Sequence, residues 1–232
     1  MNEYEKKLSD EAFRWVKANH RKIIEEFAGK AEHVADNQPI TLFMAGSPGA
    51  GKTEVSKRLI SRFIQKPVRI DADEIRGICP GYVGSNAHIF QRAATKGVHI
   101  LYDYSRENNL NVILDGTFAY ADEQKNIQGS LDRQRKVEIY FVYQDPSQAW
   151  DFTKKREEIE YRKVSKKVFI DAFIKSRENV NLVKSYFGDQ IELNLLIKDL
   201  TSDIEQLELN ILLVDSYLKK VYTRYELETL LI

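Results

Sequence analysis

The stretch that decides the fold is Gly46-Ser47-Pro48-Gly49-Ala50-Gly51-Lys52-Thr53, which matches the pattern G-x-x-x-x-G-K-[ST] at every fixed position. The apolar run at 40–45 before it has the length and composition of a buried strand. The apolar residues after it are spaced for one face of a helix: Val55, Leu59, Ile60, Phe63 and Ile64. These flanking patterns disfavour the alternative, a chance glycine-rich turn.

This strand, turn and helix are expected to bind the phosphates of a nucleoside triphosphate. The first backbone N–H groups of a helix have no helical partner, and the helix dipole adds partial positive charge there. Lys52 would reach the outer phosphates, and the Thr53 hydroxyl would ligate Mg²⁺. The predicted nucleotide-binding residues are Gly46, Ser47, Pro48, Gly49, Ala50, Gly51, Lys52 and Thr53.

The composition is that of an ordinary globular chain. Of its 232 residues, 43% are hydrophobic and 30% are charged, and the 35 basic residues equal the 35 acidic ones in number. A neutral chain lacks the field that attracts nucleic acid or an anionic membrane, so neither partner is expected. A single cysteine, a polar start and no apolar run of membrane-spanning length predict a cytoplasmic protein.

Beyond the turn, predicted strands alternate with predicted helices. Further strands are expected at 68–71, 112–115, 138–143 and about 191–197. Helices are expected at 86–106, at 148–162 and after Ser165. This alternation predicts a P-loop kinase-like α/β fold, a three-layer αβα arrangement around a mostly parallel sheet.

Two extensions flank this core of about residues 38–200, and one domain is expected to span residues 1–232. An amphipathic helix is predicted at 9–28, inside a helical extension over residues 1–30. The tail, residues 200–232, is expected to be helical and has a candidate capping box at Thr223 and Glu226.

Ligands of parallel sheets gather at the carboxyl ends of the strands, which selects the candidate site residues. The polar residues just past predicted strand ends are Asp71, Asp73, Asp115, Thr117 and Asp145. The guanine motif N-K-x-D of GTPase switches and the L-S-G-G-Q motif of transporter ATPases are absent from the sequence. A small phosphoryl-transfer enzyme is the economical interpretation.

Such an enzyme needs a base for the acceptor hydroxyl and cations for the transferred phosphoryl group. Asp73 is the candidate base; the alternative is a helix N-cap, and the two roles are compatible. Asp115 could hold Mg²⁺ through water or bind acceptor hydroxyls, or simply start a turn. Arg156 and Arg162 lie where small kinases carry lid arginines, with a solvated helix face as the alternative.

Together these motifs resemble the zeta toxin kinases over roughly residues 40–190. The resemblance rests on the phosphate loop, Asp71-Ala72-Asp73, Asp115-Gly116-Thr117, Arg156 and Arg162, in this order and spacing. Zeta toxins are the toxic half of bacterial toxin–antitoxin systems. They use ATP and Mg²⁺ to phosphorylate the 3′-hydroxyl of the amino sugar of UDP-N-acetylglucosamine.

The resemblance implies ATP and Mg²⁺ as cofactors, an antitoxin protein as partner and a role for each matching residue. Asp73 matches the catalytic base, Lys52 and Thr53 match the phosphate-loop pair, and Asp115 and Thr117 match substrate-contacting positions. Arg156 and Arg162 match the arginines that stabilise the transferred phosphoryl group. In this family an antitoxin docks near the N-terminal helices, a role that the predicted helix at 9–28 could take.

Three departures concern the acceptor side of the site. Asp115 stands where the family often has glutamate, Ala119 replaces a substrate-binding arginine, and His99 falls on a substrate-contacting glutamate. Either another cation compensates for the lost arginine, with Arg92 and Arg76 as the candidates, or the acceptor differs.

Two other functions compete with a nucleotide-sugar kinase. One is an ATP-binding regulatory protein without catalysis, against which the complete set of site residues weighs. The other is a kinase of a different hydroxylated acceptor, such as a nucleotide, an antibiotic or a nucleic-acid end. For a nucleic-acid end, the neutral charge is unfavourable because phosphate tracks call for a basic stripe.

Overall fold

The computed structural model describes residues 1–120, 122–199, 201 and 203–231, and a mostly parallel sheet runs through its centre. In this part of the chain six strands follow the order β2-β3-β1-β4-β5-β6. The first five strands in this order pair in parallel, and β6 runs antiparallel to β5. The strands are β1 (Ile40–Ala45), β2 (Val68–Asp71), β3 (Val112–Asp115), β4 (Lys136–Tyr143), β5 (Glu192–Lys198) and β6 (Ile204–Glu208).

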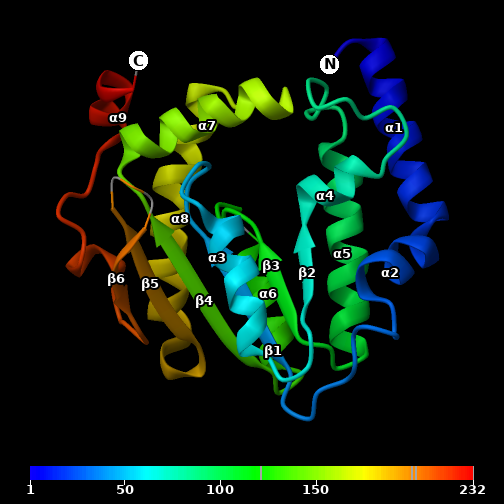
Figure 1. Ribbon diagram of the computed structural model, residues 1–232, viewed down its shortest axis with the longest axis horizontal. Coiled ribbons are helices and arrows are strands. Elements are labelled where there is room, and N and C mark those ends of the chain that lie inside the picture. The colour runs from blue at the N-terminus through cyan, green and yellow to red at the C-terminus, as the bar shows by residue number, and fades with distance from the viewer. Residues whose placement is uncertain (121, 200, 202, 232) are drawn as a thin grey trace.

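Helices cover both faces of the sheet, as Figure 1 shows, which confirms the predicted α/β fold of three layers. Helix α3 lies on one face, and α5, α6 and α8 lie on the other. The helices of the described residues are α1 (Glu3–Ala18), α2 (His20–Ala28), α3 (Lys52–Leu59), α4 (Ala72–Gly77), α5 (Gln91–Glu107), α6 (Glu123–Leu131), α7 (Pro146–Glu160), α8 (Lys166–Phe187) and α9 (Arg224–Leu230).

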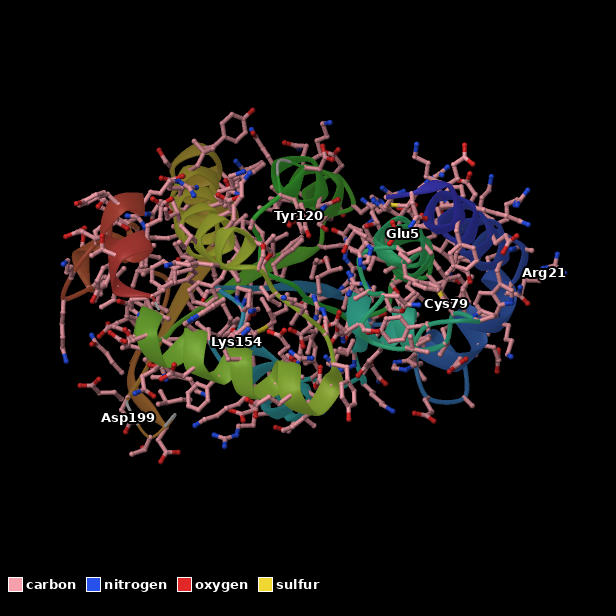
Figure 2. All side chains as sticks on the ribbon, turned by 90° about the horizontal axis from the view of Figure 1, so that it is seen from above. Glu5, Arg21, Cys79, Tyr120, Lys154 and Asp199 are labelled. Atoms are coloured by element: carbon pink, nitrogen blue, oxygen red, sulfur yellow. The ribbon has the colours of Figure 1, made fainter. Side chains whose placement is uncertain are left out.

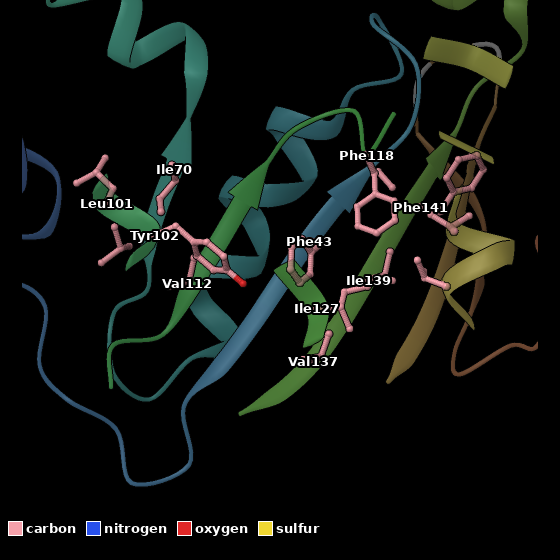
Figure 3. Packing of buried hydrophobic residues seen from close by; sticks show 14 of the residues in the cluster. Phe43, Ile70, Leu101, Tyr102, Val112, Phe118, Ile127, Val137, Ile139 and Phe141 are labelled. Carbon is pink, nitrogen blue, oxygen red and sulfur yellow. The ribbon is translucent and has the colours of Figure 1, made fainter. Parts of the chain in front are cut away.

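Strand β1 is buried on both faces, which explains its mostly apolar sequence. Leu42 and Met44 pack under α3, whereas Phe43 faces the opposite layer. There the Phe43 ring meets the rings of Tyr102 and Phe118 edge to face, with centroids 6.4 and 5.7 Å apart (Figure 3). This packing fixes the strand that leads into the phosphate loop.

The N-terminal extension differs from the single helix predicted at 9–28. It forms two helices, because Asn2 caps α1 with a capping box and Asn19 separates α1 from α2. Their buried residues, which include Val16 and Ile23, join the core next to α5. The extension is therefore a brace on the outside of α5 (Figure 1).

The prediction of a helical tail over 200–232 is wrong for its first part. Residues 204–208 form strand β6, whose backbone pairs with the edge of β5 that β4 leaves open. The candidate capping box is confirmed, because Thr223 and Glu226 start α9 by exchanging side-chain hydrogen bonds. Leu227 and Leu231 pack α9 against α7 and α8.

Two helix boundaries bear on the site. Helix α5 starts at Gln91 rather than at residue 86, and α7 ends at Glu160, so Arg162 lies in the segment after the helix.

Helix α6 was not predicted from the sequence. Across the described residues, no helix combines the length and the apolar character needed to span a membrane.

Candidate active site

Most of the predicted site residues converge at the carboxyl edge of the parallel strands. The phosphate loop follows β1, Asp73 follows β2, and Asp115 and Thr117 lie at or just past the end of β3. Helix α7 starts after β4 and crosses above this edge (Figure 1). Figure 2 looks down on the edge and shows α7, which carries Lys154, running over the sheet. The site is therefore a sheet edge with a helix across it.

The phosphate loop is held by its neighbours on both sides. Its first residue, Gly46, donates a backbone hydrogen bond to the carbonyl of Thr117 at 3.2 Å, which links the loop to the segment after β3. Gly49 has a φ of 72°, and a Cβ at this position would overlap the carbonyl oxygen of Ala149 in α7. Only glycine meets both conditions, so α7 packs directly on the loop.

The start of α3 leaves backbone donors free for an anion. Gly51, the N-cap residue, offers no side-chain cap, and the first intrahelical bond runs from the N–H of Val55 to the carbonyl of Gly51. The N–H groups of Lys52, Thr53 and Glu54 are therefore not engaged in the helix. Three neighbouring donors at the positive end of a helix fit a phosphate group.

Lys52 lies inside the site with little compensation for its charge. Its Nζ donates to the carbonyl oxygen of Ser47 at 2.6 Å. Burial lowers the pKa of Lys52 to about 8; Asp115 opposes this shift, whereas Arg156 adds to it. An anion bound in the loop would favour the charged ammonium, as the role predicted for this lysine requires.

Asp115 is almost completely buried, with 3% of its side chain exposed. Its Oδ2 accepts a hydrogen bond from the Ser56 hydroxyl at 2.8 Å and from Arg69 at 2.6 Å. Arg69 also pairs with Asp71, at 3.2 Å, and with Glu74. One arginine thus joins the ends of β2 and β3, and it fixes the carboxylate that was predicted to hold Mg²⁺.

The donor set suits Mg²⁺ only in partnership with a bound phosphate. In the described part of the chain, the Thr53 hydroxyl and Oδ1 of Asp115 make no hydrogen bond and remain available. The described part of the chain also contains no group of three or more His, Cys, Asp or Glu side chains that could bind a metal. Mg²⁺ commonly takes one or two protein ligands and fills its octahedron with water and phosphate oxygens, so these residues fit that mode.

Asp73 is surrounded by guanidinium groups from three positions. Its backbone N–H donates to Oδ1 of Asp71 at 2.8 Å, so Asp71 rather than Asp73 caps α4. Its carboxylate pairs with Arg76, one turn further along α4, and with Arg162. The guanidinium of Arg156 lies 3.5 Å away. The helix-cap alternative for Asp73 is therefore wrong, and its side chain points toward the cations.

Helix α7 delivers two of these arginines from different backbone settings. Arg156 lies within the helix and also pairs with Glu160 at 2.7 Å. Tyr161 ends the helix with a φ of 57°, a left-handed conformation that turns the chain and brings Arg162 back to Asp73. The carbonyl of Glu160 packs against Gly84, where a Cβ would overlap it. The end of α7 therefore contacts the segment between α4 and α5.

Of the two α5 residues predicted to bind substrate, Arg92 lies outside the site and His99 lies on an exposed side of the helix. Arg92 does not reach the site: its guanidinium pairs with Asp10 at 2.5 Å and stacks 4.0 Å from the centroid of Phe13, both on α1. His99 is exposed on α5, near the start of α6. There a hydrogen bond from Lys125 lowers the pKa of Asp122, with a smaller contribution from His99.

Three side chains at this edge hold the predicted site residues in place, and the sequence did not predict these contacts. Ser56 and Arg69 position Asp115, and Arg76 holds Asp73 while 3% of its residue surface is exposed. Each resembles an ordinary polar residue of a helix or strand in the sequence. The sequence suggests Arg76 only as a substitute cation, and the structure places it next to the predicted base.

Comparison with known proteins agrees with this architecture. The family model described as Zeta toxin matches residues 24–204. No curated protein matches the sequence. A solved chain from the PezAT chromosomal toxin-antitoxin system of Streptococcus pneumoniae has 15% sequence identity and a TM-score of 0.66, and the alignment covers 100% of this chain and 88% of that one.

Two solved AvrRxo1-ORF1:AvrRxo1-ORF2 complexes are also similar. The complex with sulphate ions has 14% identity and a TM-score of 0.59, with 91% of this chain and 70% of that one covered. The complex with ATP has 13% identity and a TM-score of 0.58, with 88% and 65% covered. At these identities the structural matches establish a shared fold. Since the family model spans most of the sequence, the chain belongs to the zeta toxin family and has its P-loop kinase-like fold.

Proposed function

We propose that the chain is an ATP- and Mg²⁺-dependent kinase that phosphorylates a hydroxyl of UDP-N-acetylglucosamine or a related nucleotide sugar. The observation that carries this proposal is the arrangement around Asp73. A carboxylate held by Arg76, Arg156 and Arg162 stands at the same sheet edge as the phosphate loop and Lys52. This places a base and cations beside a triphosphate cradle, which are the parts that phosphoryl transfer needs.

In this proposal Asp73 accepts the proton of the acceptor hydroxyl while that oxygen attacks the γ-phosphorus of ATP. The carboxylate is 23% exposed, so it is accessible from the site, and its pairing with arginines fixes its orientation. An entering acceptor hydroxyl would take the place of one of these arginine contacts. The proton ends on Asp73, and the bond between the γ-phosphorus and the bridging oxygen breaks to release ADP.

Arg156 and Arg162 would then stabilise the charge of the transferred phosphoryl group. Both reach Asp73 from α7 or from the turn after it, so both lie where the attacking oxygen meets the phosphoryl group. Lys52 would neutralise the outer phosphates, and its lowered pKa of about 8 would rise on contact with them. Preorganised cations of this kind act without reorganising during the reaction.

Mg²⁺ would be held by the Thr53 hydroxyl and, directly or through water, by Asp115. When bound, the ion would offset the negative charge of the phosphates. The chain's contribution is to fix Asp115 through Ser56 and Arg69, at 2.8 and 2.6 Å. Thr117, whose carbonyl accepts from Gly46, would contact the acceptor from the segment after β3.

The acceptor is proposed from the family, and Ala119 and His99 are the positions where the chain departs from the family's substrate-contacting residues. Arg92, one of the two substitute cations considered, is committed to α1. Arg76 is the remaining one, and it is buried and paired with Asp73. Arg76 would therefore act by holding Asp73, and the altered residues at 99 and 119 would leave room for a differently shaped sugar.

We also propose an antitoxin protein as a partner. The support is the family and the PezAT match, which is described as a toxin-antitoxin system. Helices α1 and α2 form the outer surface beside α5, and the exposed side chain of Arg21 lies on them (Figure 2). An antitoxin bound to these helices would reach the part of the site that α4 forms with Asp73 and Arg76.

The proposal is tested by incubating the protein with Mg²⁺, ATP and a panel of nucleotide sugars. Mass spectrometry identifies any product that carries one added phosphoryl group, and the Asp73→Asn variant serves as the blank. The expected result is a phosphorylated nucleotide sugar from the wild type only. ATP binding without a product on the whole panel would support the silent ATP-binding alternative and contradict this acceptor class.

A further inference from the structure

A second lysine, Lys198, lies against the phosphate loop although no motif includes it. It is the last residue of β5 and points to the same face of the sheet as Leu196, which packs under α3. A Cβ built on Gly51 would overlap its Nζ and would lie 3.2 and 3.3 Å from its Cε and Cδ. The whole outer half of this side chain therefore runs along Gly51.

The charge of Lys198 is buried with one partner. Only 4% of the side chain is exposed, and Nζ donates to Oε2 of Glu54 at 2.8 Å. Glu54 is the one hydrogen-bond partner that the described residues provide, and it is itself 66% exposed. An ammonium group has three donors, and burying it without full compensation is costly.

The location of Glu54 relates this lysine to the phosphate cradle. Glu54 is the third residue of α3, and its backbone N–H is one of the three left free at the helix start. The N–H groups of such a loop and helix start cradle the inner phosphates, while the loop lysine reaches the outer ones. Lys198 therefore adjoins the end of the cradle that faces the nucleoside, away from Asp73 and the arginines of α7.

We propose that Lys198 binds the α-phosphate of the nucleotide, exchanging the carboxylate of Glu54 for a phosphate oxygen. This rests on the proposed nucleotide-binding function and adds a residue to it. In the ligand-free protein Glu54 holds the ammonium in place. When a nucleotide binds, the phosphate supplies further acceptors, and the exposed Glu54 side chain turns into solvent at little cost. Lys52 and Lys198 thus divide the triphosphate between its outer and inner ends.

The alternative is a purely structural ion pair in which Lys198 and Glu54 brace the start of α3. The two interpretations differ in what Glu54→Gln does. If the pair braces the loop, removing either charge weakens nucleotide binding equally. If Lys198 binds phosphate, Glu54→Gln releases the ammonium and removes a negative charge near the phosphate, so nucleotide affinity is kept or increased.

Calorimetry with ATP, ADP and AMP on the wild type, Lys198→Met and Glu54→Gln separates these interpretations. For Lys198→Met we expect a loss of roughly ten- to a hundredfold in affinity, similar for all three nucleotides because all carry the α-phosphate. For Glu54→Gln we expect equal or tighter binding. Thermal unfolding of each variant identifies misfolded protein, and Glu54→Gln keeps the test decisive if Lys198→Met does not fold.

Affinities for Lys198→Met within twofold of the wild type would overturn the proposal. So would a loss for Glu54→Gln as large as that for Lys198→Met, which would establish the brace. A loss confined to ATP would move Lys198 to the outer phosphates and would equally contradict the assignment. A wild type that binds none of the three nucleotides would instead refute the nucleotide site itself.

Discussion

Replacing Arg69 by methionine should destabilise the protein strongly, because this arginine neutralises the largely buried carboxylates of Asp71 and Asp115. The side chain of Arg69 is 9% exposed, and those of Asp71 and Asp115 are 12% and 3% exposed. Methionine keeps much of the apolar stem of the arginine but removes the cation. Asp115 would then retain the Ser56 hydroxyl as its hydrogen-bond donor.

The size of the effect follows from this burial. Removing one partner of a buried ion pair costs about 3–5 kcal/mol in the free energy of unfolding, because the remaining charge is uncompensated. With a urea m-value of about 3 kcal/mol per molar, the midpoint of unfolding should fall by roughly 1–1.7 M. The exposed pair Lys125–Asp122, with 84% and 69% exposure, is the matched control, and Lys125→Met should cost less than about 1 kcal/mol.

Urea unfolding followed by circular dichroism measures both variants, and a double-mutant cycle identifies the mechanism. Asp115→Asn removes the stranded charge, so the double variant Arg69→Met/Asp115→Asn should be more stable than the sum of the single changes predicts, by about 1–3 kcal/mol. Strict additivity, or a loss for Arg69→Met no larger than that for Lys125→Met, would refute the assignment of Arg69 as the cation that makes a buried Asp115 tolerable.

Two further outcomes follow from the site. Burial lowers the pKa of Lys52 to about 8, and bound phosphates raise it again, so ATP binding should take up roughly half a proton at pH 8 and almost none near pH 6, where the lysine is already charged. Calorimetry in buffers of different ionisation enthalpy measures this uptake, and its persistence in Lys52→Met would mean that a group other than Lys52 takes up the proton. Arg92→Ala should leave phosphoryl transfer within about twofold of the wild type and cost about 1 kcal/mol of stability through the contacts to α1. A turnover loss of more than tenfold with normal substrate affinity and unchanged stability would return Arg92 to the site.

The central strands could be predicted because burial in the sheet determines their sequence pattern. Strands β1, β2 and β3 begin and end at the predicted residues. Strands β1 and β3 appear as short, mostly apolar runs, and β2 alternates apolar and polar residues before the turn at its end. The phosphate loop is equally easy to recognise in the sequence, because its glycines and lysine are required at fixed positions. Both features depend on local sequence, so a single chain suffices to find them.

The tail could not be predicted because its structure depends on a distant partner. In β6, Ile204 and Leu207 are largely exposed, so the strand lacks the alternation that marks a half-buried strand. What makes this segment a strand is the open edge of β5, which no pattern within residues 204–208 reveals. Likewise, α6 follows the segment after β3 without a strong apolar stripe.

The site was only partly predictable for a similar reason. The candidate base was predicted from its place after a strand, and the lid arginines from the family resemblance. The return of Arg162 depends on the left-handed Tyr161, a conformation unusual for tyrosine. Arg92 was misplaced because the amphipathic pattern of α5 does not state which neighbour covers its polar side. In the structure that neighbour is α1, whose start at Glu3 was also missed.

Phosphoryl transfer by Asp73→Asn tests the central claim most directly. Single-turnover transfer from γ-labelled ATP to the acceptor found on the nucleotide-sugar panel should fall by about 10²- to 10⁴-fold, while the ATP dissociation constant stays within about threefold of the wild type. The matched variant is Asp171→Asn, which removes a carboxylate paired with Arg224 outside the site and should transfer at the wild-type rate. Transfer by Asp73→Asn at a rate close to that of Asp171→Asn would contradict the role of Asp73 as the base.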